Sequence, residues 1–286
     1  MARHAAGSPA ALSHLCRDGV IVVKVGGDVD SAPVLDEVTE LVAAGRPTVL
    51  VHGGGIAADE LADQLGVARE VITSPDGTRS RRTTPAMLTV LTLALLGRVK
   101  PELLSGLRAR GVRGVGLCGA DGALITASRK PVIRSVRDGR TVLIRDDRSG
   151  RIEHIDPTLV RLVLEHDVVP VVSPPVSDAE GNLLNADADG VAAGLAEALD
   201  ASALVLLTRV CGVLADLDEP SSRLREVGPH HLAGDLVRGR MRHKVRAALR
   251  ASRTVGRVAI GGGNHHRPIR HALSGGGTWV CEGSVA

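Results

Sequence analysis

The sequence predicts an α/β fold, a three-layer αβα sandwich in which helices cover both faces of a mainly parallel central sheet. Short runs of β-branched residues recur along the 286-residue chain, and most are followed by glycine and then by a segment with helical periodicity. Alternation of this kind is typical of parallel sheets flanked by helices. The core would be largely aliphatic, because the chain has no Phe or Tyr and a single Trp.

The predicted elements follow one another in chain order. The strand-like run IVVKVGG precedes a helix over residues 32–44, and PTVLVHGGG precedes the helical IAADELADQLG. Residues 113–117 are predicted as a strand; next, DVVPVVSPP precedes the helical DGVAAGLAEALD, and the strand-like ASALVLLTRV and GRVAIGGG follow. Ligands of such sheets bind at the carboxyl ends of the strands, and the two early glycine clusters fall at such ends.

Residues 128–156 form a segment of a different kind. Their strand-like runs are separated by the turn dipeptides DG and SG, which are typical of antiparallel hairpins. We expect this segment to be an antiparallel hairpin lid that covers the sheet rather than a part of it.

Two lobes are expected, residues 1–199 and 200–286, with a boundary after the helix that ends near Asp200. No linker composition marks this boundary, so the lobes are expected to share one continuous sheet. Residues 1–19 lack the long apolar core of a signal peptide. They are expected to be a flexible extension or to add an assembly contact.

Composition excludes several classes of function. With 35 Lys and Arg against 32 Asp and Glu, the net charge of +3 is too small to indicate a polyanion, and the near absence of aromatic rings argues against base stacking, so no nucleic acid is expected. Four scattered cysteines without a CxxC pair favour a reduced, cytoplasmic location. The most apolar run is half the length of a membrane span, and no histidine or cysteine spacing matches a metal site, so neither a membrane nor a protein-bound metal is expected.

Lys24, inside the first strand-like run, supports two interpretations. Glycines after a strand let backbone N–H groups approach an anionic oxygen, and a lysine just before them would add a full charge to that cradle. The alternative is a lysine on an edge strand whose ammonium group reaches solvent. Neither glycine cluster is a Walker A loop or a Rossmann GxGxxG sequence.

Two further stretches carry polar groups near predicted helices. Asn185, Asp187 and Asp189 stand two residues apart before a helix, where each would either cap it or point into a cleft. Lys244, in GRMRHKV, is expected to begin a basic helix whose simplest interpretation is a solvated face.

Taken together, Lys24, the triple glycine, Asn185 with Asp189, and Lys244 resemble in order the amino acid kinase family, in particular acetylglutamate kinase, from about residue 20 to 280. The stretches TSPDGTRSRRT, RDDRSG, LNADADG and RGRMRHKV are similar to the branch that acts on glutamate or 2-aminoadipate attached to a small acidic amino-group carrier protein, often called LysW.

The resemblance implies a reaction. The γ-phosphoryl group of ATP would pass to a side-chain carboxylate and give an acyl phosphate, in lysine, ornithine or specialised amino-acid biosynthesis. A carboxylate with a pKa near ~4.3 needs no general base, so catalysis would consist of positioning and charge neutralisation. The catalytic groups implied are Lys24 on the substrate side, Lys244 on the nucleotide side, and Asp189, which aims both.

The resemblance also implies binding residues. Backbone N–H groups of Gly26, Gly27, Gly54 and Gly55 would hold the phosphoryl oxygens. Arg81 would grip the substrate α-carboxylate and Asn185 would bind the substrate. The N-terminal lobe would hold the substrate and the C-terminal lobe ATP, with Mg²⁺ arriving with the nucleotide. Residues expected near the nucleotide are Thr208, Arg209 and Gly212; the family usually has Asp or Asn where Arg209 stands.

A carrier-bound substrate implies basic residues around the cleft, and family members are commonly homodimers. The expected carrier contacts are Arg79, Arg82, Arg98, Lys100, Arg240 and Arg242, although an arginine-rich chain also places unrelated arginines on its surface. Two alternatives stay open: an acetylglutamate kinase of arginine biosynthesis, and a non-catalytic nucleotide-binding sensor, which the departure at Arg209 favours.

Overall fold

The computed structural model describes residues 19–75, 77, 79–234 and 236–283. At its centre is an eight-stranded sheet, in which every pair of neighbours is parallel except β15 and β16. The mainly parallel sheet predicted from the sequence is therefore confirmed. Its strands, in spatial order, are β14 (Glu226–Val227), β16 (Thr278–Val280), β15 (Val258–Gly262), β13 (Ala203–Thr208), β1 (Ile21–Val25), β2 (Thr48–His52), β10 (Val169–Ser173) and β5 (Gly114–Cys118).

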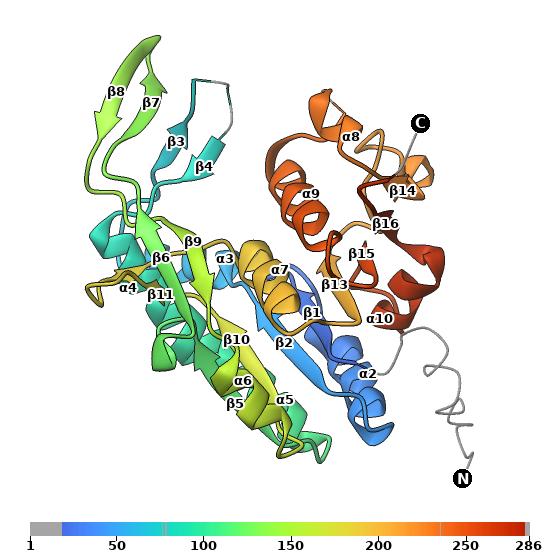
Figure 1. Ribbon diagram of the computed structural model, residues 1–286. Helices are drawn as coiled ribbons and strands as arrows, with labels where there is room; N and C mark the ends of the chain where they lie inside the picture. Colours follow the sequence, from blue (N-terminus) through green and yellow to red (C-terminus); the bar gives the residue numbers. More distant parts are fainter. Residues whose placement is uncertain (1–18, 76, 78, 235, 284–286) are drawn as a thin grey trace.

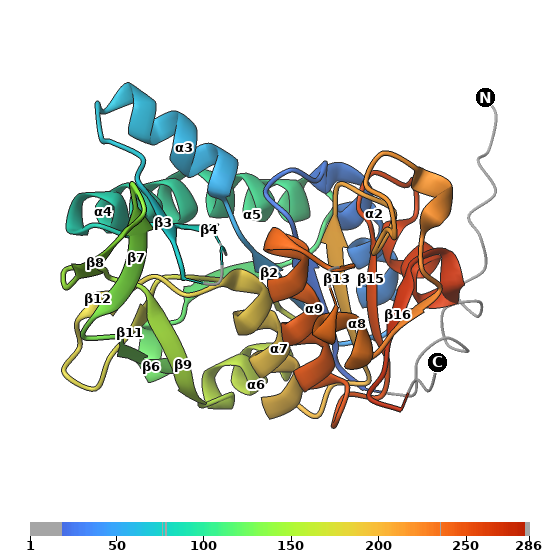
Figure 2. The ribbon, with the colours of Figure 1, turned by 90° about the horizontal axis from the view of Figure 1, so that it is seen from above.

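Helices cover both faces of this sheet, as the views in Figures 1 and 2 show. Side chains that alternate along β1 enter two separate cores: Val22 packs with α7 and α9, whereas Val23 packs with α2 and α5. Burial on both faces explains why these strands are nearly continuous apolar runs. The covering helices are α2 (Ser31–Ala43), α5 (Lys100–Ala109) and α10 (Pro268–His271) on one face, and α6 (Thr158–Leu164), α7 (Ala188–Ala198) and α9 (Gly239–Ala251) on the other.

The helix starts follow ordinary capping chemistry. Asp30 accepts a hydrogen bond from the N–H of Ala32 at the start of α2, and Thr84 accepts one from Met87 at the start of α4. α3 (Gly55–Gln64) packs on α4 (Pro85–Ala94), which continues through a π-helical turn (Leu95–Val99) into α5. Short helical turns complete the chain: Asp121–Ala123, Pro220–Ser222, α8 (His230–Ala233) and Ala272–Gly276.

Antiparallel strands are confirmed within residues 128–156 and lie outside the central sheet, whereas a further hairpin at residues 71–81 was not predicted. A four-stranded sheet has the order β12 (Leu183–Leu184), β11 (Val176–Ser177), β6 (Ile125–Arg129) and β9 (Gly150–Ile155). Two antiparallel hairpins, β3 (Val71–Thr73) with β4 (Arg79–Arg81) and β7 (Ile133–Arg137) with β8 (Arg140–Ile144), project beyond it on the side where α8 and α9 stand (Figure 1).

The strands after residue 199 join the sheet directly, because β13 pairs with β1. Residues before and after the predicted lobe boundary thus share one sheet. No helix in the described part of the chain combines the length and apolarity of a membrane span. Residues 1–18 lie outside the described residues, so the expectation for the N-terminal extension stays a prediction.

One helix boundary differs from the prediction. α9 begins at Gly239, five residues before Lys244, which therefore lies in its second turn. Gly239 has a positive φ of 55°, a backbone conformation that residues other than glycine rarely adopt. This conformation lets the chain enter the helix at Gly239, earlier than the basic pattern indicates.

Candidate active site

The carboxyl ends of the central strands and the starts of two helices meet at one edge of the sheet. β1 ends just before Gly26, and β2 ends just before Gly53. α7 and α9 pack against each other over β1 and β13, and their first turns point to the same edge. This edge is where the sequence analysis expects the ligand.

Three charged side chains meet there. Lys24 Nζ lies 2.9 Å from Asp189 Oδ1, and Lys244 Nζ lies 2.8 and 2.9 Å from the two oxygens of the same carboxylate. The three residues are only 7–8 % exposed. Lys24 stands on a central strand between β13 and β2, so the edge-strand interpretation is wrong; Lys244 and Asp189 are likewise not solvated surface charges.

The cluster of Lys24, Asp189 and Lys244 carries one positive charge in excess, because two ammonium groups share one carboxylate. Burial on its own would raise the pKa of Asp189, but the charges of Lys244 and Lys24 outweigh it and lower that pKa to about 2. Burial lowers the pKa of Lys244, and Lys24 acts in the same direction, while Asp189 opposes both. Such a cluster neutralises an anion and is unsuited to take up a proton.

The capping interpretation holds for one of the neighbouring acids. Asp187 is the N-cap of α7 and accepts a hydrogen bond from the N–H of Asp189 at 3.4 Å. Its side chain is exposed. Asp189, in the first turn, faces inward to the lysines instead.

The two glycine loops touch one another beside this cluster. A Cβ added to Gly27 would lie 3.2 Å from the N atom of Gly55, and one added to Gly54 would lie 2.7 Å from Leu95. Gly54 precedes α3, so the free N–H groups of that helix face the loop of Gly26 and Gly27. A helix start and glycines without side chains together suit phosphate oxygens.

His52, which the sequence analysis assigned no role, fixes the second loop. It is 1 % exposed, and its Nδ1 lies 3.0 Å from the carbonyl oxygen of Gly53. Because a carbonyl only accepts, Nδ1 carries the proton. Burial, with the charges of Lys100 and Lys24, lowers the pKa of His52 to about 4 and keeps the ring neutral. Its position before three glycines was the available signal.

A second wall of the site is built around Thr83. Asn185 Nδ2 lies 3.4 Å from Thr83 Oγ1, and the N–H of Thr83 donates to Asp147 Oδ2 at 2.8 Å. Asp147 is buried and also accepts from the N–H of Ser149. Thr83 and Asp147 were not predicted; their presence inside two of the quoted family-like stretches was the only signal.

Arg81 lies beside the glycine loop, at the end of β4. Its Nη2 donates to Asp59 Oδ1 at 2.5 Å and to the carbonyl oxygen of Gly55 at 3.3 Å. Burial lowers the pKa of Arg81, and Arg240 acts in the same direction, while Asp59 opposes them. The predicted substrate arginine is thus near both the cradle and the start of α9.

The predicted nucleotide-proximal residues follow β13. Thr208 is its last residue, and Arg209 is exposed immediately after it. Gly212 is buried, because a Cβ there would lie 2.5 Å from Thr278 Oγ1. No group of three His, Cys, Asp or Glu side chains among the described residues is arranged to hold a metal ion.

The predicted carrier contacts have different surroundings, and one of them is wrong. Lys100 is 6 % exposed and donates to the carbonyl oxygen of Leu117 at 2.5 Å. Its stem lies over Gly116, where a Cβ would come within 2.7 Å of Lys100 Cδ, so the missing side chain makes room for it. A lysine held in this way cannot meet a partner protein.

The other predicted contacts divide into paired and unpaired arginines. Arg82 bridges Glu70 and Asp146, each at 2.6 Å, and Arg98 pairs with Glu60 at 2.7 Å. Arg242 donates to the carbonyl oxygen of Gly234. The remaining two, Arg79 and Arg240, are exposed and make no ion pair within the part of the chain that the structure describes.

Comparisons with known proteins identify the family of the chain. Residues 19–261 match the model of the Amino acid kinase family. A LysW-aminoadipate kinase of Deinococcus radiodurans is 36 % identical over 266 residues, covering 91 % of each chain, and an acetylglutamate kinase of Methanococcoides burtonii is 35 % identical over 223 residues, covering 74 % of this chain and 69 % of its own. The crystal structure of smu.665 from Streptococcus mutans UA159 superimposes with a TM-score of 0.72 at 25 % identity, covering 92 % of this chain and 98 % of that one.

Proposed function

Because the chain belongs to the amino acid kinase family, we propose that it transfers the γ-phosphoryl group of ATP to the side-chain carboxylate of glutamate or 2-aminoadipate held on a small acidic amino-group carrier protein. A phosphotransferase of the amino-acid-kinase type is common to both relatives described above. The observation that carries the proposal is the cluster of Lys24, Asp189 and Lys244 beside two glycine loops.

The proposed mechanism needs no proton acceptor. A glutamyl-type carboxylate is already ionised at neutral pH, with a reference pKa of ~4.3, and is itself the nucleophile. The obstacle is repulsion between this anion and the triphosphate. Lys24 and Lys244 reduce it from the two sides, and each is expected to supply roughly 2.7–4 kcal/mol of transition-state stabilisation, the magnitude known for single oxyanion donors.

Asp189 positions both ammonium groups. Its low pKa keeps it ionised throughout the working range, so the lysines stay aimed without a bound anion. The N–H groups of Gly26, Gly27, Gly54 and Gly55 would receive the equatorial oxygens in the proposed complex. Magnesium would be held by the ATP phosphates and add positive charge to the leaving group.

The substrate would lie between Arg81 and Asn185. Arg81 already holds the carboxylate of Asp59 in a short ion pair, which supports its proposed grip on the α-carboxylate of a substrate. Asn185 and Thr83 present an amide and a hydroxyl on the facing wall.

The carrier-bound substrate is supported by the relatives' names and by the basic residues around the site. The acetylglutamate kinase relative supports a second candidate, phosphorylation of free N-acetylglutamate. Glutamate and aminoadipate differ by one methylene, worth only ~1–3 kcal/mol of discrimination, so both belong to the proposal.

An ADP-release assay tests the proposal. The purified protein is given ATP, Mg²⁺ and, in separate reactions, carrier bearing C-terminal glutamate, carrier bearing C-terminal aminoadipate, and free N-acetylglutamate. Turnover of at least one carrier-bound substrate with kcat/KM about 100-fold above that of the free amino acid is expected, corresponding to ~2.7 kcal/mol. Preference for N-acetylglutamate selects the second candidate, and no ADP release from any substrate selects a non-catalytic role.

A further inference from the structure

The hairpins β3–β4 and β7–β8 form one projecting unit, here named the hairpin arm. The N–H of Thr73 on β3 donates to Ser135 Oγ on β7 at 3.2 Å, and Arg137 on β7 lies 3.7 Å from Glu70. Figure 1 shows the two hairpins side by side, rising above the edge of the sheet where the active-site cluster lies. These contacts join the two hairpins into one unit.

Arg82 fixes the arm at its base. Its guanidinium group donates to Glu70, before β3, and to Asp146, after β8. The hydrogen bond to Asp146, followed by that to Glu70, raises the pKa of Arg82. This arginine serves the arm itself, and its charge is not available to a partner.

The outer part of the arm is strongly basic. Residues 129–148 carry seven Arg and Lys against three Asp, a large excess in a chain with a net charge of only +3. Arg134, Arg140 and Arg145 are exposed, as is Arg79 on the neighbouring hairpin. Within the described residues none of these four makes an ion pair. Unpaired arginines held on paired strands suit a partner rich in carboxylates.

An exposed leucine stands among these charges. Leu143 is 54 % exposed and pairs in register with Arg134. Opposite residues of an antiparallel ladder share one face, so Arg134 and Leu143 lie together. Ser135 and Val142 form the next pair and face the other way, where Ser135 meets β3. The outward face thus offers both charge and an apolar contact, the usual composition of a protein interface.

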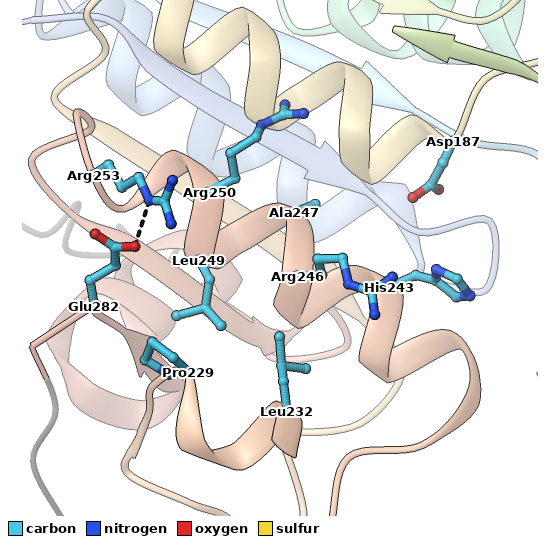
Figure 3. A pocket seen from close by; sticks show the side chains of 10 residues that line it. All are labelled: Asp187, Pro229, Leu232, His243, Arg246, Ala247, Leu249, Arg250, Arg253 and Glu282. Carbon is cyan, nitrogen blue, oxygen red and sulfur yellow. Dashed lines mark hydrogen bonds and ion pairs between the residues drawn. The ribbon is translucent and has the colours of Figure 1, made fainter. Parts of the chain in front are cut away.

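A groove along α9 is the competing docking surface (Figure 3). It has a volume of about 520 Å³ and an apolar floor that includes Pro229 and Leu232. Its charges are nearly balanced, however: Arg253 pairs with Glu282 at its far end, and Arg250 pairs with Glu197. Asp187 lies at the near end, so an acidic partner would gain less there than on the arm.

We propose that the hairpin arm is the docking surface of the acidic carrier protein. Arg79, Arg134 and Arg145 meet carboxylates of the carrier, and Leu143 meets an apolar side chain among them. β4 ends at Arg81, so the surface that binds the carrier continues directly into the substrate wall. The inference rests on the proposed function and names where its partner binds.

The test is steady-state kinetics of the full-length enzyme with a purified carrier bearing C-terminal glutamate or aminoadipate. The double variant Arg134→Glu/Arg145→Glu is expected to raise KM for the carrier about 10- to 100-fold, with kcat and KM for ATP changed less than about twofold, because rim charges act on encounter rather than chemistry. Leu143→Ser is expected to raise the same KM about threefold.

Arg108→Glu is the matched control. Arg108 is exposed in the last turn of α5, at the opposite edge of the sheet, and is expected to leave every constant within about twofold. Equal melting temperatures of all variants would exclude unfolding as the cause of a change in KM. Added salt should raise KM for the wild type more steeply than for the double variant.

The outcomes separate the two proposals. If the wild type phosphorylates none of the carrier-bound substrates, the proposed function fails, and the docking inference fails with it. If the wild type phosphorylates the carrier and the double variant matches Arg108→Glu, only the docking inference is overturned. If the double variant loses retention on heparin or DNA resin but keeps the wild-type KM for the carrier, the arm serves a different polyanion, which also overturns it.

Discussion

Asp189 and Glu37 are buried carboxylates on opposite faces of the central sheet, and their surroundings shift their pKa values in opposite directions. Asp189, on α7, meets two ammonium groups, and its pKa falls to about 2. Glu37, on α2, accepts hydrogen bonds from the N–H groups of Ile269 and Arg270, yet burial raises its pKa to about 7. The difference teaches that two backbone donors together with the charge of Arg270 do not offset desolvation at Glu37, whereas two ammonium groups in direct contact do so at Asp189.

The largest effect on stability and activity is expected from a change at Asp189. Replacing Asp189 with Asn leaves two buried ammonium groups facing a neutral amide. Breaking a buried pair costs about 3–5 kcal/mol, and kcat is expected to fall more than about 1000-fold because the lysines lose their aim. Urea unfolding and ADP release measure the two effects.

Asp187→Asn is the control for that change. Asp187 is exposed and caps α7, and asparagine caps a helix equally well. Its stability should stay within about 0.5 kcal/mol of the wild type. A similar stability for Asp189→Asn would show that the ion pairs are not a major stabilising feature.

Lys244→Met sharpens the comparison by removing one of the two charges. Asp189 keeps Lys24 as a partner, so the loss of stability should be smaller than in Asp189→Asn, while kcat should fall about 100- to 1000-fold. Arg246→Met, at an exposed position of the same helix, is the control. Equal activities of these two variants would exclude Lys244 from phosphoryl transfer.

Glu37→Gln tests the other side of the comparison. The pKa of Glu37 is raised on folding, so the folded state binds a proton more tightly than the unfolded state between pH 4.5 and about 7. The free energy of unfolding contributed by this group therefore rises as pH falls through that window, by about 3 kcal/mol. Glutamine should remove this slope and stabilise the protein at pH 8, as measured by urea unfolding at several pH values.

For Asp189 the sign is the reverse. Its pKa is lowered on folding, so its contribution is present above pH ~4 and is lost as pH falls toward 2, by about 2 kcal/mol. If Glu37→Gln kept the wild-type slope between pH 4.5 and 7, the assignment of that slope to Glu37 would be refuted.

Asp147 extends the comparison to a third buried carboxylate and has the smallest expected effect. Asp147→Ala leaves the N–H groups of Thr83 and Ser149 without an acceptor, at a cost of about 1–3 kcal/mol. KM for the acceptor substrate should rise while KM for ATP stays constant. Glu165→Ala, at an exposed position at the end of α6, is the control. An unchanged acceptor KM in Asp147→Ala would show that Asp147 does not support the substrate wall.

Much of the fold was predictable because its rules are local. β1 and β2 are short apolar runs that end in glycine, and strands of this kind are buried on both faces. The chain order of Lys24, Asp189 and Lys244 pointed to a common site, and the structure brings the three side chains into contact.

The rest depended on contacts that no local pattern carries. Lys100 stands two residues after Arg98, where a surface lysine was expected, and only the later Gly116 makes room to bury it. The bond between Thr83 and Asp147 joins residues 64 positions apart, and no periodicity predicts it. In the sequence Arg82 does not differ from other surface arginines; its role follows only from its ion pairs with Glu70 and Asp146 in the folded chain.

The pairing of β13 with β1 limits how the two halves of the chain can move relative to each other. Backbone hydrogen bonds between β13 and β1 join the two halves of the chain in one sheet. The halves are therefore not two separate units connected by a flexible linker. A motion that separated β13 from β1 would break the hydrogen bonds of this pairing.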